Sequence, residues 1–114
     1  MNLPKRMTLY RLVNTAEKGL MPQYTLSKLS DEFYAERVIG YNRQYAAMGV
    51  NQRVDVLARI WRNCMIRIND YAVLEDGNQY RIDFIQHMDN EDGLPVTDLT
   101  LVRLEENYDV AGQA

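Results

Sequence analysis

The sequence predicts a mainly β protein: a small antiparallel β-barrel or sandwich of about five to seven strands, with one short helix and a long early loop. Apolar and polar residues alternate with a period of two in several segments, as in strands that bury one face. The pair Asp76-Gly77 stands between two apolar runs, which is a strong short-range signal for a β-hairpin. A chain of 114 residues has room for one core. We therefore expect one domain over residues 1–106 and a flexible tail over residues 107–114.

The first forty residues predict two strands separated by a loop. Residues 5–13 alternate well enough to form the first strand. Residues 14–30 are polar and contain Gly19 and Pro22, so we expect a long loop there, and long loops in compact domains are often functional or disordered. Residues 31–41 predict the second strand, with a break or bulge near Gly40.

The middle of the chain predicts a short helix over residues 42–50. Tyr41, Tyr45 and Met48 recur at positions i, i+4 and i+7, which places them on one face of a helix. Gly49 can end this helix, because glycine readily adopts the left-handed conformation that follows a last helical turn.

The second half predicts strands joined by short turns. Residues 54–61 alternate between apolar and polar and form the expected third strand. Residues 71–75 and 79–85 are the two strands of the hairpin around Asp76-Gly77, and residues 96–104 supply the last strand.

The hairpin turn is expected to be type I′, in which both central residues have positive φ. This turn fixes the expected register, because it places Glu75 opposite Asn78. The apolar residues then face one another across the two strands, with Val73 opposite Tyr80 and Tyr71 opposite Ile82.

The residues that could carry chemistry are few, so we expect no enzyme, no cofactor and no metal. The chain has one cysteine, Cys64, expected to be a half-buried apolar residue, and one histidine, His87, whereas a zinc site needs about four ligands. A general base at His87 oriented by Asp89 is the alternative to a surface histidine beside carboxylates. The six glycines are too scattered to form a phosphate-binding loop.

Charge and hydropathy limit the kinds of partner that we expect. The formal net charge of -3 argues against a protein whose main role is to bind phosphates. Four arginines cluster, but nearby aspartates dilute them, which favours a solvated or partner-facing surface; they are Arg53, Arg59, Arg62 and Arg67. No apolar run approaches the roughly 20 residues that cross a bilayer, so we expect no membrane partner and a cytoplasmic protein.

The order of expected elements resembles that of the head–tail joining proteins of tailed bacteriophages, also called head-closure or stopper proteins. Individual segments carry the resemblance: residues 33–38 (FYAERV), 42–47 (NRQYAA), 54–60 (VDVLARI), 65–68 (MIRI), 72–82 (AVLEDGNQYRI) and 99–106 (LTLVRLEE). Together they span most of residues 5–106.

The resemblance implies a structural virion protein without enzymatic activity. It implies a homo-oligomeric ring at the head–tail junction that closes the DNA-filled head below the portal or its adaptor. The same ring would present a surface to the tail terminator or tail-completion protein. Genomic DNA would pass through the lumen without sequence-specific binding.

Two sets of residues are the expected sites of this function. The segment around residues 41–53 is the candidate lumen-facing or gating element, with Tyr41, Arg43, Gln44, Tyr45, Met48 and Asn51 as its candidate residues. The early loop, the arginine cluster and the tail are candidates for docking on neighbours, through Met21, Tyr24, Lys28, Arg59, Arg62 and Tyr108.

Two alternatives remain open at this point. A tail-completion or tail-terminator protein of the same virion would share the β character and the ring. A single-strand nucleic-acid binder of the OB type would use Trp61, Tyr71 and Tyr80 as stacking platforms over Arg59 and Arg81. The simpler interpretation of Tyr71 and Tyr80 is that both are core aromatic residues.

Overall fold

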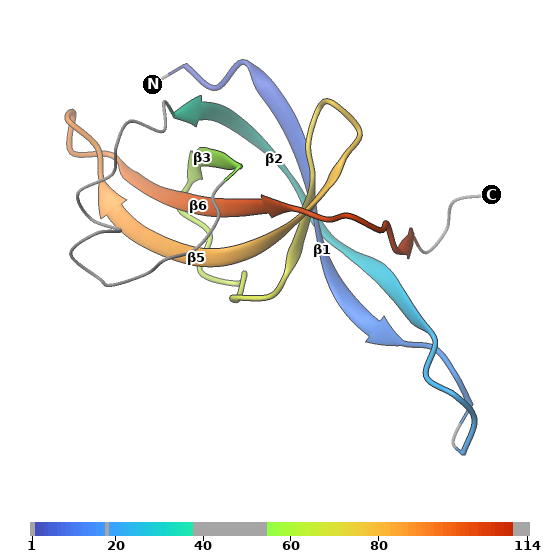
Figure 1. Cartoon of the computed structure of the whole chain (residues 1–114). Coiled ribbons are helices and arrows are strands. Elements are labelled where there is room, and N and C mark those ends of the chain that lie inside the picture. Colours follow the sequence, from blue (N-terminus) through green and yellow to red (C-terminus); the bar gives the residue numbers. More distant parts are fainter. Residues whose placement is uncertain (1, 18, 38–54, 111–114) are drawn as a thin grey trace, which may run out of the picture.

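The computed structural model describes residues 2–17, 19–37 and 55–110, and in these residues the chain is mainly β without a helix (Figure 1). The predicted helix over residues 42–50 and the predicted bulge near Gly40 lie outside the described residues. The seven strands are β1 (Lys5–Asn14), β2 (Tyr24–Arg37), β3 (Val56–Trp61), β4 (Tyr71–Val73), β5 (Gln79–Asp89), β6 (Pro95–Arg103) and β7 (Asp109–Val110).

The strands form one mixed sheet in which six strands close a circuit of pairings. The order is β1-β4-β5-β6-β3-β2-β7, and β1 also pairs with β2. All pairs within the circuit are antiparallel, whereas β7 runs parallel to β2. The prediction of a mainly β chain is therefore confirmed, and the parallel β2–β7 pair is an addition to it.

The core lies on the inner side of this circuit, where alternate residues of each strand point. Ala58, for example, stands opposite Leu99, and both are fully buried. The loop between β3 and β4 adds Ile66, which packs into the same cluster. The main cluster consists of Met7, Leu9, Tyr34, Ala58, Ile60, Ile66, Ala72, Leu74, Tyr80, Ile82, Leu99 and Leu101.

The expectation of a long loop over residues 14–30 is wrong for residues 24–30, which belong to strand β2. Strand β2 begins at Tyr24 rather than at residue 31, because pairing with β1 continues out to Asn14 opposite Tyr24. Polar composition suggested a loop, yet both faces of a two-stranded arm meet water and accept polar residues. In this part of β2, Leu26 is fully buried and packs in a second cluster with Tyr10 and Tyr71.

The hairpin between β4 and β5 exists as predicted, but its register differs by one residue. Val73 stands opposite Gln79, Ala72 opposite Tyr80 and Tyr71 opposite Arg81.

A three-residue loop is the physical reason for this shift. The Gly77 amide donates to the Leu74 carbonyl at 2.9 Å, and the Leu74 amide donates to the Asn78 carbonyl at 3.3 Å. Gly77 has a φ of 81°, whereas Asp76 is not among the residues with positive φ. The turn is therefore a type I turn followed by a bulge glycine, and not the expected type I′ turn.

The tail after β6 folds back onto the body at residues 108–110, within the segment expected to be a flexible tail. The Gln79 side chain exchanges two 2.8 Å hydrogen bonds with the Tyr108 backbone. The Tyr108 ring lies edge-on to Tyr71, with centroids 5.5 Å apart. Strand β7 then pairs with β2 at Thr25 and Leu26.

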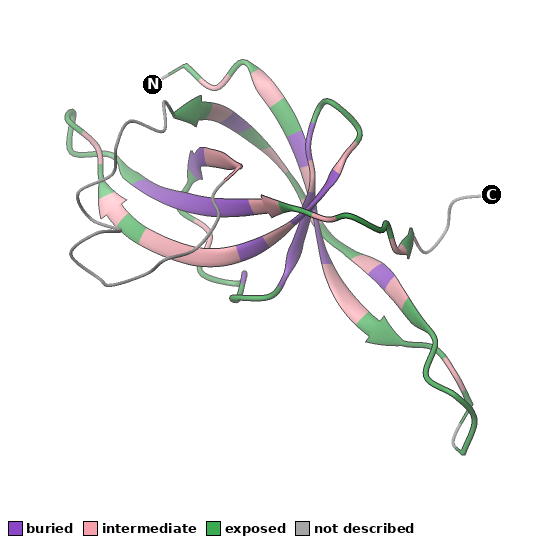
Figure 2. Cartoon of the chain, in the orientation of Figure 1, coloured by how far each residue is buried: buried purple, intermediate pink, exposed green. Residues whose placement is uncertain are grey.

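The ends of β1 and β2 project from the body as a two-stranded arm (Figure 1). Figure 2 shows that exposed residues dominate towards the tip of this arm, whereas buried residues gather in the body. We call residues 11–27 the arm and residues 15–24 its tip. The arm gives the molecule a long axis of 49 Å against 30 and 24 Å in the other two directions.

Candidate interaction surfaces

The tip of the arm is held by hydrogen bonds across its base. The Asn14 side-chain oxygen accepts from the Ala16 amide at 3.0 Å and from the Gln23 amide at 3.1 Å. The Thr15 amide donates to the Gln23 carbonyl at 2.8 Å. Asparagine bonds of this kind to a nearby backbone amide replace the ladder where strands separate. The tip therefore leaves the sheet from a fixed base.

Apolar side chains crowd the tip without cover from the body. Met21 is 85% exposed, Leu20 65% and Tyr24 49%. A shallow hollow of about 500 Å³ lies beside Leu20 and Met21 and is also lined by Thr15, Ala16, Glu17 and Gln23. Single exposed apolar residues are ordinary, but a contiguous exposed set on a projecting element indicates a contact site.

A second apolar surface lies on the outer side of the circuit of strands. Tyr34 and Ile60 are paired across β2 and β3 and point inward, so the next residues along, Phe33 and Trp61, point outward. Phe33 is 58% exposed and Trp61 41%. The Arg6 guanidinium lies 5.8 Å from the centre of the Phe33 ring and supports it by a cation–π contact. We call Phe33 and Trp61 the aromatic ledge.

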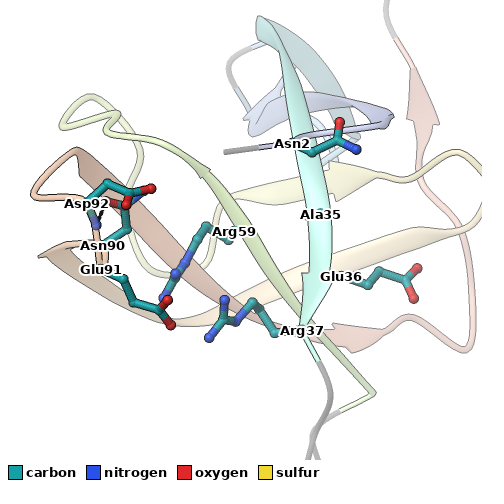
Figure 3. Close-up of a pocket in the computed structure, with 8 residues that line it drawn as sticks. All are labelled: Asn2, Ala35, Glu36, Arg37, Arg59, Asn90, Glu91 and Asp92. Atoms are coloured by element: carbon teal, nitrogen blue, oxygen red, sulfur yellow. Dashed lines mark hydrogen bonds between the residues drawn. The ribbon is translucent and has the colours of Figure 1, made fainter.

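A polar cleft lies near the end of β2 and contains no catalytic arrangement. Its volume is about 280 Å³, and β2, β3 and the β5–β6 turn line it, with Asn2 at its edge. Figure 3 shows Arg37 and Arg59 pointing into the same space with Glu91 near both, while Glu36 points away. The mixed charges suit a polar contact, and no described nucleophile lies among the lining residues.

Arg59, a predicted docking residue, has a side chain that is largely buried. Arg59 Nε lies 2.7 Å from Asp98 Oδ1, and Nη2 lies 3.0 Å from Oδ2, with both side chains only 10% exposed. The hydrogen bonds to Asp98 raise the pKa of Arg59, although burial opposes them. The arginine is thus held in a bidentate pair across β3 and β6 and has little surface to offer.

The other predicted docking residues fall in separate places. Met21 and Tyr24 share the arm, and Lys28 lies further along β2, where it pairs with Asp31 at 2.8 Å. Arg62 donates to the Met88 carbonyl at 2.9 Å. Tyr108 packs on the body, as described above. The structure therefore brings together Met21 and Tyr24 and separates them from the rest.

The predicted lumen-facing residues lie outside the described residues. They are Tyr41, Arg43, Gln44, Tyr45, Met48 and Asn51.

The two residues that could carry chemistry, His87 and Cys64, have ordinary surroundings. His87 Nδ1 lies 2.8 Å from Thr97 Oγ1, whereas Asp89 pairs with Arg62. The general-base alternative required Asp89 to orient His87, and Asp89 does not do so. Cys64 is exposed and not half-buried, because its loop turns Ile66 inward. In residues 2–17, 19–37 and 55–110, no cluster of three or more metal-binding side chains occurs.

The aromatic platform of the single-strand alternative does not form as predicted. Tyr71 and Tyr80 are 7% and 5% exposed and belong to the two core clusters, so they cannot stack on bases. The interpretation of both as core aromatic residues is confirmed. Trp61 alone of the three is exposed, and its neighbour on the ledge is Phe33, which the sequence did not single out.

The sequence carries a signal for the tip but not for the ledge. Met21, a predicted docking residue, stands in Leu20-Met21-Pro22, an apolar run inside a polar stretch, which indicates an exposed contact. The ledge was missed, because only the pairing of β2 with β3, which ends at Tyr34 and Ile60, brings the strands that carry Phe33 and Trp61 together.

Comparison with known proteins adds no family to this geometry. No protein-family model matches the chain, and a search of curated proteins finds no significant match. Among the described residues there is also no helix long and apolar enough to cross a membrane. The function must therefore be argued from the surfaces above.

Proposed function

We propose that the chain is a structural subunit of the head–tail junction of a tailed bacteriophage or prophage. Copies assemble into a ring that closes the DNA-filled head below the portal or its adaptor and offers a surface for tail attachment. The ring performs no reaction and uses no cofactor. DNA passes through it without sequence-specific contacts, which agrees with the net charge of -3.

One observation carries this proposal: a fixed, apolar-tipped arm projects from a closed β body. A single copy leaves Leu20 and Met21 in water, where they contribute nothing to its own core. Exposed apolar surface of this kind marks a site of contact with another protein. The resemblance in element order suggests the kind of assembly.

The closed circuit of strands supports the same role. Each strand of the circuit pairs on both sides over part of its length, which leaves little open edge for uncontrolled association. Association is then directed to the loops and the arm. This is what a building block of a defined ring requires.

The test is to incubate the purified chain with DNA-filled, tailless heads and to examine the vertices by electron microscopy. We expect an added ring at the portal vertex and slower loss of DNA from the heads. A matched control is the double variant Leu20→Asp/Met21→Asp, which keeps the body and removes the apolar tip. Unchanged vertices with the native chain overturn the proposal. Added density on isolated tails, in place of heads, assigns the chain to tail completion instead.

A further inference from the structure

We infer that the tip of the arm of one copy binds the aromatic ledge of the next copy. This inference rests on the proposed ring and names its subunit contact. The tip supplies Leu20, Met21 and Tyr24, and the ledge supplies Phe33 and Trp61 with Arg6 beside them.

Geometry excludes the contact within one copy. Tyr24 and Phe33 are nine positions apart on the same extended strand β2, which separates them by roughly 30 Å at about 3.3 Å per residue. The arm points away from the body (Figure 1), and its base is fixed by the Asn14 hydrogen bonds. The tip of one copy can therefore reach a ledge only on another copy.

The chemistry of the two surfaces is complementary. Met21, the most exposed large apolar residue of the described chain, carries a polarisable thioether that packs favourably against aromatic rings. Phe33 and Trp61 offer such rings on adjacent strands, each one residue beyond the last β2–β3 pair, Tyr34 with Ile60. The cation–π contact with Arg6 favours the present position of the Phe33 ring, which reduces the side-chain freedom lost on binding.

The small area of the tip–ledge contact indicates why a closed ring is needed to stabilise it. From the exposed fractions, and with about 200 Å² for a whole aromatic side chain, tip and ledge together bury on the order of 500 Å². A stable pair of proteins needs at least about 1,000 Å². One contact alone is thus weak, and an isolated pair held by it forms only at high protein concentration. In a closed ring, every copy gives a tip and receives one, which doubles the contacts per copy.

The two surfaces differ, so the contact is head-to-tail. A head-to-tail contact forms a ring when its rotation closes and a filament when it does not. Symmetric pairing of tip with tip is the competing arrangement, and it would leave the ledge uncovered.

Disulfide trapping tests the inference in a Cys64→Ser background, because Cys64 is exposed and would react. One preparation carries Met21→Cys and the other carries Phe33→Cys, and the two are mixed under mild oxidation. We expect the mixed dimer at roughly ten times the yield of a control mixture, because contact raises the effective concentration of the two thiols. The control pairs Met21→Cys with Glu105→Cys, an exposed position beyond the far end of β6 from the ledge. Equal yields in the two mixtures overturn the inference. Preferential dimers of Met21→Cys with itself also overturn it.

A second measurement uses complementation and does not depend on cysteines. The variants Met21→Asp and Trp61→Asp are each expected to remain monomeric in sedimentation at concentrations where the native chain associates. Their mixture should form dimers and no larger species, since each pair retains one intact tip and one intact ledge. A mixture that stays monomeric overturns the inference, provided that circular dichroism shows both variants folded.

The outcome is separable from that of the proposed function. If the native chain adds a ring to filled heads but no tip–ledge crosslink forms, the head–tail assignment stands and this contact is wrong. If the crosslink forms but heads stay unchanged, the chain makes this contact in some other assembly.

Discussion

Single residues in this protein act mainly by fixing strands to one another. Arg59 and Asp98 join β3 to β6 through a bidentate pair, and Arg11 joins β1 to the loop before β4 through Asp70, with contacts of 3.1 and 3.0 Å. Such buried pairs do not by themselves raise stability greatly, but a lost partner leaves a buried charge that is strongly destabilising. In the proposed ring, these two ion pairs would keep the body rigid while it contacts its neighbours.

Tyr80 predicts a loss of stability at alkaline pH. Burial, followed by the 2.8 Å hydrogen bond that its hydroxyl donates to Asp76, raises the pKa of Tyr80 to about 12 from its ordinary value of 10. The protonated form is favoured by folding, so its contribution is fully present below pH 10 and disappears as the pH rises towards 12.

Urea unfolding between pH 8 and pH 12 measures this effect. The native chain should lose stability on the order of 2 kcal/mol over the alkaline range. The variant Tyr80→Phe should show a shallower slope there, since it has no hydroxyl to ionise. Identical slopes for both proteins would rule out the linkage.

The elements divide into a body that is fixed by its core and an arm that is fixed by its turn chemistry. Strands β3, β5 and β6 bury alternate residues in the main cluster, so their register is set by packing. The arm has only the small cluster around Leu26 at its base, and beyond that point the Asn14 side chain and the β1–β2 ladder hold it.

Gly77 tests the assignment of the β4–β5 turn. Its φ of 81° lies in the left-handed region, and no atom lies within 4 Å of where a Cβ would stand. Replacement by alanine should therefore lower the free energy of unfolding by about 1 kcal/mol through backbone strain alone. Replacement by asparagine, which tolerates this conformation better, should lower it by less, as measured in chemical denaturation. Equal losses, or none, would contradict the assigned turn.

The whole molecule separates stability from association. The core lies in the body, whereas the large apolar residues that are more than 40% exposed lie on the tip, on the ledge and in the loop before β4. In the proposed ring, this separation would allow a subunit to fold alone at low concentration and to assemble when its neighbours are held in place.

Matched substitutions on the two parts should therefore have opposite effects. Leu20→Ser at the tip should change the free energy of unfolding by no more than about 0.5 kcal/mol, because its side chain already contacts water. Leu26→Ala at the base of the arm, where the side chain is fully buried, should lower it by about 3 kcal/mol. Thermal and urea unfolding measure both, and sedimentation should show reduced association for Leu20→Ser. A strongly destabilised Leu20→Ser protein would mean that the tip belongs to the core.

The parts of the fold that local patterns control were predictable from the sequence. Alternation located β3, β5 and β6 to within a few residues, and Asp76-Gly77 located a hairpin. The register of that hairpin was not predictable from the pair alone, because Asp-Gly also suits a three-residue loop with a bulge glycine. Met21 and Tyr24, which the sequence singles out for docking, are exposed. The burial of Arg59 was not predictable, because its partner Asp98 is 39 positions away.

By itself, the sequence determined the fold class and the order of the main strands. Those properties follow from short-range periodicity and residue type, which every window of the chain displays. Only the tertiary structure decided that β2 extends into an arm, that Tyr108 returns to the body and that β2 pairs with β3 as far as Tyr34 and Ile60, next to Phe33 and Trp61. Each of these depends on pairing between residues far apart in the chain, because a strand with two polar faces is stabilised by its neighbour and not by its own pattern.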